Sequence, residues 1–169
     1  MSMGFSSSPS TRRILNWLPA AIAVAVIACE STAAMGASNT SRWLLPIWVH
    51  LFGPITPARW NVVHHYIRKT GHFTGYGLVS LSFFHGWRTT LSLAGRTVQS
   101  LWRSAALLAI SCTLLIASAD EFHQSFLPGR TSSPYDVGID VSGAILTQCI
   151  VLAIMPRLRR SRQEHAIAV

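Results

Sequence analysis

Polar and ionisable side chains recur at helical spacing in three segments of the sequence. Two segments repeat the spacing four, three, four: His65, Lys69, His72 and Tyr76 in one, and Asp136, Asp140, Gly143 and Thr147 in the other. In the third segment, Ser118, Glu121 and Gln124 are spaced by three and three, and Asp120 and His123 flank them. Residues three and four apart share a helix face, so the spacing predicts three polar stripes.

The chemistry of these stripes is that of binding polar or anionic groups. Burying paired charges adds little stability, because the cost of desolvation offsets their attraction. We therefore expect Asp120, Glu121 and Asp140 to be functional. The counter-charge would come from Lys69 or from Arg130 in the turn Pro128-Gly129-Arg130. The complete set of predicted ligand-binding residues is Lys69, His72, Tyr76, Asp120, Glu121, His123, Gln124, Arg130, Asp136 and Asp140.

Purely structural roles stay open for several of these residues and their neighbours. Lys69 could be an interface anchor, because long basic side chains extend toward water. Asp136 could serve only as a helix cap, since carboxylates favour helix N-termini. His64 and His65 could lie in a loop or at the membrane interface. Glu30 could line the wall of the pocket or lie at the interface.

The elements that must position these stripes are four apolar segments. They run from Ile14 to Cys29 and on to about Met35, then over about 69–87, 104–119 and 133–156. The second could begin earlier, because Thr56-Pro57 suits a helix start. The last begins at Ser133-Pro134, where Ser133 and Asp136 would form a capping box. Open backbone cannot face lipid, so each segment is expected to be helical.

The composition supports a membrane protein. Half of the 169 residues are hydrophobic and only 12% are charged, against about 25% in soluble domains. The formal charge of +8 comes from clusters between apolar runs, which is a pattern of membrane topology and not of nucleic-acid binding. The three cysteines form no CxxC pair, so we expect them to pack as small residues between helices.

The predicted fold is all-α: a polytopic membrane protein with a four-helix transmembrane bundle and an interfacial segment between its first two helices. That segment includes the run 44–52, which is too short to span and is followed by Trp60. We expect a disordered tail over residues 1–11, one membrane domain over 12–156 and a basic tail over 157–169. The first apolar segment also has the form of a signal peptide, but three more segments follow it.

The orientation follows from the basic residues, which are enriched on cytoplasmic loops. Nine of the 14 lie on the side that holds both termini, and five lie on the other. Both termini are therefore predicted to be cytoplasmic. The three polar stripes lie near the outer ends of their helices, so they should form one outward-facing pocket.

Two blocks of sequence resemble the VanZ-like family of small polytopic membrane proteins. Arg68-Lys69-Thr70-Gly71-His72-Phe73 with Tyr76 is similar to its motif R/D-K-x-x-H-F-x-x-Y. The run from Asp120 to Arg130, then Asp136-Val137, Asp140 and Gly143, is similar to E-x-x-Q-x-F-x-P-G-R followed by D-V and D/N-x-x-G. The resemblance covers about residues 60–150. Position 75 is Gly where many relatives have Glu, Asp140 stands where many have Asn, and Thr147 replaces a common second Gly.

The resemblance implies a multi-pass protein of the bacterial cytoplasmic membrane, and it names no reaction. The family takes its name from a protein that raises resistance to teicoplanin, which suggests a link to antibiotic resistance and the cell envelope. On this ground the partners expected are the lipid bilayer and a lipid-linked cell-wall precursor or a lipoglycopeptide. We expect no nucleic acid as a partner, and the oligomeric state is not predicted.

Three functions remain open. The first is binding of the polar or anionic headgroup of an envelope amphiphile in the pocket. The second is an intramembrane hydrolase or transferase that uses carboxylate and histidine chemistry. Because the sequence contains no HExxH motif and no fixed metal-ligand spacing, we expect no metal and no cofactor. The third is a bundle that docks to another membrane protein through its polar face.

Overall fold

The computed structural model describes residues 9–92 and 97–167, and within these ranges every regular element is a helix. The elements are α1 (Pro9–Glu30), the short 3-10 helix η1 (Ala33–Met35), α2 (Ala37–Phe52), α3 (Pro57–Ser92), α4 (Val98–Gln124) and α5 (Pro134–Ile167). The prediction of an all-α fold is confirmed.

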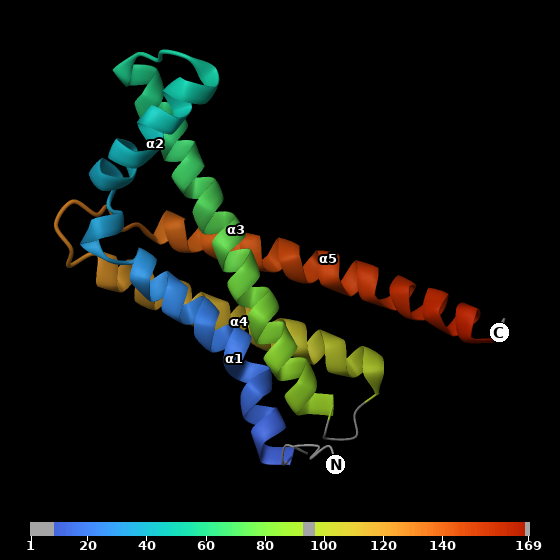
Figure 1. Cartoon of the computed structure of the whole chain (residues 1–169). Coiled ribbons are helices and arrows are strands. Elements are labelled where there is room, and N and C mark those ends of the chain that lie inside the picture. Colours follow the sequence, from blue (N-terminus) through green and yellow to red (C-terminus); the bar gives the residue numbers. More distant parts are fainter. Residues whose placement is uncertain (1–8, 93–96, 168–169) are drawn as a thin grey trace, which may run out of the picture.

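The helix α3 is the centre of the molecule. It packs against α1, α4 and α5, and α4 also packs against α5. In Figure 1, α3 runs diagonally across the other helices, and α2 lies beside the end at which α3 begins. The end of α1, the first half of α3, the end of α4 and the start of α5 thus approach one another, and these are the parts that contain the polar stripes.

Three helices extend further than their apolar runs predicted, and the first of them, α3, continues to Ser92. α4 begins at Val98 and ends at Gln124, so Arg103, Asp120 and Glu121 lie within it. α5 continues through Pro156 to Ile167, although the sequence predicted an end at Met155-Pro156. Charged residues near helix ends are compatible with helix, whereas an interior proline removes a backbone donor and crowds the preceding turn, which is why the sequence predicted an end at Pro156.

The predicted tails are affected in the same way. α1 begins at Pro9, so residues 9–11 are helical and not disordered, while residues 1–8 lie outside the described part of the chain. Residues 157–167 of the basic tail continue α5. The division into one domain and two tails stays a prediction.

The starts of α3 and α5 agree with the sequence, but the predicted capping box does not form. α3 begins at Pro57, and the Trp60 amide donates to the Thr56 carbonyl at 2.9 Å. At the start of α5, the Ser133 hydroxyl accepts from the Tyr135 amide at 3.2 Å. The Ser133 amide donates to Oε2 of Glu121 at 3.0 Å. Glu121 therefore takes the place of Asp136, whose carboxylate pairs with Lys69.

The predicted interfacial segment is the helix α2, which leans on the first turns of α3. The Trp60 indole donates to the Ser41 hydroxyl at 2.7 Å, and the Thr40 hydroxyl lies 3.1 Å from Nε2 of His64. Trp48 stacks on Phe52 with ring centroids 4.5 Å apart. The opposite surface of α2 is exposed and apolar, as at Trp43, Ile47, Leu51 and Phe52.

Glycine allows α3 and α5 to cross closely. A Cβ atom built on Gly143 would lie 2.0 Å from the Phe73 carbonyl oxygen, and one on Gly77 would lie 2.6 Å from Oγ1 of Thr147. A Cβ on Gly75, two residues before Gly77, would meet nothing within 4 Å, so this glycine takes no part in the close contact. On the other side of α3, Phe84 packs against Ala105, Ala106 and Ala109 of α4. Small residues at such contacts let helix backbones approach closely.

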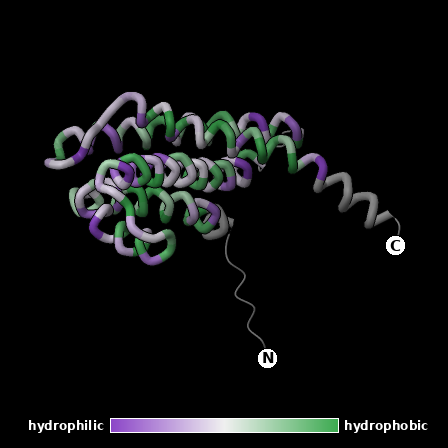
Figure 2. The backbone as a smooth tube through the Cα atoms, turned by 90° about the horizontal axis from the view of Figure 1, so that it is seen from above, coloured by the Kyte–Doolittle hydropathy of each residue, from purple (hydrophilic) through white to green (hydrophobic). Residues whose placement is uncertain are grey.

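The bundle buries polar as well as apolar side chains, and much of its exterior is apolar. Asp140, Gln148, Thr113 and Ser80 are fully buried, whereas large apolar side chains such as Leu78, Leu107, Leu115 and Ile150 are exposed. Figure 2 shows that hydrophobic residues predominate along the helices within the bundle. Large exposed apolar surfaces are typical of contact with lipid or protein.

Among the described residues, two helices are long and apolar enough to cross a membrane: Val98–Gln124 and the first 24 residues of α5, Pro134–Arg157. α1 contributes a shorter apolar stretch, Leu18–Glu30. Four crossings are therefore not confirmed. The cysteines also differ from expectation, because Cys29 and Cys149 are exposed on the apolar exterior and only Cys112 is partly buried.

Candidate functional site

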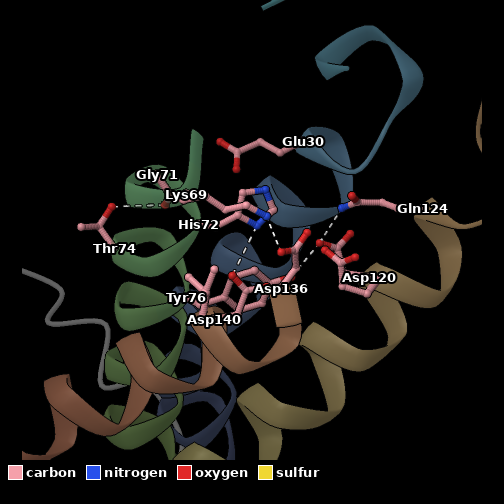
Figure 3. Close-up of polar contacts among 12 residues, drawn as sticks. Glu30, Lys69, Gly71, His72, Thr74, Tyr76, Asp120, Gln124, Asp136 and Asp140 are labelled. Atoms are coloured by element: carbon pink, nitrogen blue, oxygen red, sulfur yellow. Dashed lines mark hydrogen bonds and ion pairs between the residues drawn. The ribbon is translucent and has the colours of Figure 1, made fainter. Parts of the chain in front are cut away.

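The polar ends of α3, α4 and α5 enclose a cavity of about 250 Å³. Its walls contain basic, acidic and amide side chains: Asn61, His64, His65, Arg68, Lys69, His72, Glu121, Gln124 and Asp136, with Ala37 and Thr131. In Figure 3, Lys69, His72, Tyr76, Asp120, Asp136 and Asp140 converge between the three helices. The shared cavity expected from the three stripes is therefore present.

Lys69 and Asp136 form an ion pair across the cavity, from α3 to α5. Both side chains are mostly buried, with 27% and 14% of their surfaces exposed. Lys69 is therefore more than an interface anchor, and Asp136 is more than a helix cap.

A second network lies behind the cavity. The buried Tyr76 hydroxyl donates to Oδ2 of Asp120 at 2.8 Å, and the Gln124 amide donates to the same oxygen at 2.9 Å. Two of the three residues predicted for the stripe on α4, Glu121 and Gln124, are buried, and Asp120 replaces Ser118 on that face. Asp120 lies on the buried face with Glu121 and Gln124, whereas Ser118 and His123 are exposed.

Replacing Tyr76 with Phe removes one donor from the buried Asp120 carboxylate. We expect the free energy of unfolding to fall by about 1–2 kcal/mol, since the ring still fills its place. Thermal unfolding in detergent measures this change. Tyr66→Phe is the control, because Tyr66 is 66% exposed; equal stability of both variants would contradict the role of the hydrogen bond.

His72, Glu121 and Asp140 form a third group, with one residue from each of α3, α4 and α5. One candidate ligand atom of each lies within 4.8 Å of those of the other two. Nδ1 of His72 is 3.4 Å from Oδ1 of Asp140, and Asp140 is fully buried. Glu121 also anchors the α4–α5 loop, because its backbone carbonyl accepts from the Ser132 hydroxyl at 2.7 Å. This group could hold a cation or share a proton.

Arg130 and His123 were predicted to join the pocket, and both engage the end of α1 instead. Arg130 donates through Nη1 to the Met35 carbonyl at 2.8 Å and through Nη2 to the Glu30 carbonyl at 2.9 Å. Nδ1 of His123 lies 3.0 Å from the Ser31 hydroxyl. Arg130 therefore holds the end of α1 and the following η1 through hydrogen bonds, and it does not pair with the buried acids.

A larger and mainly apolar groove of about 480 Å³ adjoins the polar cavity. It lies between α1, α2 and α3, and its apolar lining includes Val26, Ile27, Leu44, Ile67, Leu78 and Val79. Arg68 and His72 line both the groove and the cavity. Glu30 and Arg130 are also at the groove, so Glu30 belongs to its wall.

Arg68 is the charged residue among several cavity residues that the predicted set omitted. It falls one position away from the stripe that contains Lys69, but the first motif of the resemblance includes it. Its charge also acts on its surroundings. Burial lowers the pKa of His64, which lies ahead of the expected second span, and the positive charge of Arg68 lowers it further.

Buried polar groups within an apolar exterior, together with two described helices long enough to cross a bilayer, are features of a helical membrane protein and indicate that class. The particular family follows from comparison. The family described as VanZ/LLP1 matches residues 3–155, and the chain belongs to it. No curated protein and no solved structure matches the chain.

Proposed function

We propose that the chain binds an amphiphile of the cell envelope, with its anionic headgroup in the polar cavity and its hydrocarbon chain in the apolar groove. The observation that carries this proposal is that the two spaces adjoin at Arg68 and His72. An arginine suits a phosphate, because its guanidinium offers paired donors. Lys69 lies at the same wall, where it forms the ion pair with Asp136.

The geometry favours an amphiphile over a water-soluble ligand. The groove is open along the exposed apolar sides of α1 and α3, where Val26 and Leu78 lie at the surface. A chain could enter there from lipid while its head reaches Arg68. A polyprenyl diphosphate, the lipid carrier type of cell-wall precursors, combines both features.

Binding of a polyprenyl diphosphate to the purified chain in phosphatidylcholine nanodiscs tests this proposal. Arg68→Gln should weaken binding by at least about tenfold, because each charged hydrogen bond contributes about 1.5–3 kcal/mol. Arg59→Gln is the matched control, since Arg59 lies on the same helix, is exposed and lines neither space. Equal binding of the neutral polyprenol would refute the anionic headgroup. Competition by inorganic diphosphate as strong as that of the lipid would refute the groove.

We also propose the finer topology: four crossings of the bacterial cytoplasmic membrane, both termini in the cytoplasm and the cavity facing outward. Its support is the excess of basic residues on the side of the termini. A link to glycopeptide resistance belongs to the same proposal. If expression protects susceptible cells against teicoplanin, Arg68→Gln should abolish that protection and Arg59→Gln should retain it.

A second candidate function is an intramembrane hydrolase or transferase that acts on the same amphiphile. The observation that favours it is the contact between His72 and the buried Asp140, because an imidazole oriented by a carboxylate can transfer protons. Release of inorganic phosphate from the polyprenyl diphosphate by the wild type, but not by His72→Gln, is the expected result. Unchanged lipid after prolonged incubation would exclude hydrolysis.

A further inference from the structure

Three side chains of metal-binding type meet at the inner end of the polar cavity. They come from three helices: His72 from α3, Glu121 from α4 and Asp140 from α5. Their ligand atoms lie within 4.8 Å of one another. His72 and Glu121 also line the cavity, so water could reach the group from that side.

Three of the four carboxylate oxygens in this group lack a hydrogen-bond donor. Both carboxylate oxygens of Asp140 and Oε1 of Glu121 are buried and accept no hydrogen bond from any described residue. Oδ1 of Asp140 lies 3.4 Å from Nδ1 of His72. Burying a charged carboxylate without a partner is energetically unfavourable, so a positive charge beside these oxygens would stabilise them.

The two cations expected to supply that charge are engaged elsewhere. Lys69 pairs with Asp136, and Arg130 donates to the carbonyls of Met35 and Glu30. Glu121, in turn, is already oriented: Oε2 accepts from the Ser133 amide at 3.0 Å, which leaves Oε1 turned to the group. Such outer hydrogen bonds commonly hold a metal ligand in place.

We propose that His72, Glu121 and Asp140 bind one divalent transition-metal ion, such as Zn²⁺ or Mn²⁺. One imidazole nitrogen and two carboxylate oxygens suit these ions. A fourth position would face the cavity and hold water or an oxygen of a bound headgroup. The ligand atoms would move closer together on binding, since metal–ligand distances are about 2.0–2.2 Å. This site revises the expectation from the sequence, which was of no metal.

The test is equilibrium dialysis of the full chain in detergent, stripped with chelator and then exposed to Zn²⁺ or Mn²⁺, with metal measured by elemental analysis. We expect about one ion per chain for the wild type. Asp140→Asn and Glu121→Gln should weaken binding at least about tenfold, as should His72→Ala. His65→Ala and Glu30→Gln are the matched controls, because His65 lines the same cavity and Glu30 is an exposed acid of the groove.

Two measurements keep the test decisive. Saturating metal should raise the Tm of the wild type, which requires no variant to fold. Arg68→Gln should bind metal like the wild type even though it loses the polyprenyl diphosphate, so the two proposals can fail separately. Less than stoichiometric metal, equal binding by Asp140→Asn, Glu121→Gln and the wild type, or an unchanged Tm would show an adventitious ion only and overturn the site.

Discussion

Gly143→Ala should prevent α3 and α5 from packing closely against each other. Among glycine-to-alanine substitutions in the described residues, we expect it to cause the largest loss of stability. The added Cβ would lie 2.0 Å from the Phe73 carbonyl oxygen and 2.9 Å from its carbon. Both are backbone atoms, so no side-chain rotation relieves the clash and the helices must separate. We expect a loss of about 3 kcal/mol or more in the free energy of unfolding, the upper range for overpacking.

Thermal unfolding in detergent measures this effect, and two other glycines provide its scale. Gly75→Ala, on α3 close to the crossing, is the control. Its Cβ would meet nothing within 4 Å, and alanine favours helix. Gly77→Ala should fall between the two, since its Cβ would meet the Thr147 hydroxyl at 2.6 Å, and that side chain can rotate. If the Gly143→Ala protein were as stable as the Gly75→Ala protein, α3 and α5 would not be in close contact at Gly143.

The sequence predicted the polar stripes of α3 and α5 well, because helical periodicity alone fixes which residues share a face. His72 meets Asp140, and Lys69 meets Asp136, for this reason. The same argument could not separate Gly75 from Gly77, since both lie near the crossing in sequence and only the packing of α5 decides which one it touches.

Loops limited the prediction of the site. Arg130 was assigned to the pocket from its place between two acidic helices, but the α4–α5 loop turns it toward the end of α1. Helical periodicity contains no information on that direction. Glu121 shows the opposite case: its face was predicted, whereas its bond to the Ser133 amide depends on how the loop returns.

The contacts of Arg130 lead to the second large effect. Its guanidinium joins the Glu30 carbonyl, at the last residue of α1, to the Met35 carbonyl, at the end of η1. Carbonyls at the end of a helix have no partner within it, and basic side chains commonly supply one. Arg130→Ala should therefore destabilise the protein by about 2 kcal/mol, because charged hydrogen bonds contribute about 1.5–3 kcal/mol each and this pair is partly exposed to solvent.

Arg130→Lys separates geometry from charge. A lysine has a single nitrogen and cannot match the fork that reaches both carbonyls, so about half of the loss should remain. Amide hydrogen exchange over residues 30–36 should become faster in both variants, while Arg42→Ala, an exposed arginine on α2, should leave it unchanged. If Arg130→Ala instead abolished binding of the polyprenyl diphosphate without changing exchange or Tm, Arg130 would be a ligand of the headgroup. Its contacts with the α1 carbonyls would then be secondary, and the positive wall of the cavity would extend across the α4–α5 loop.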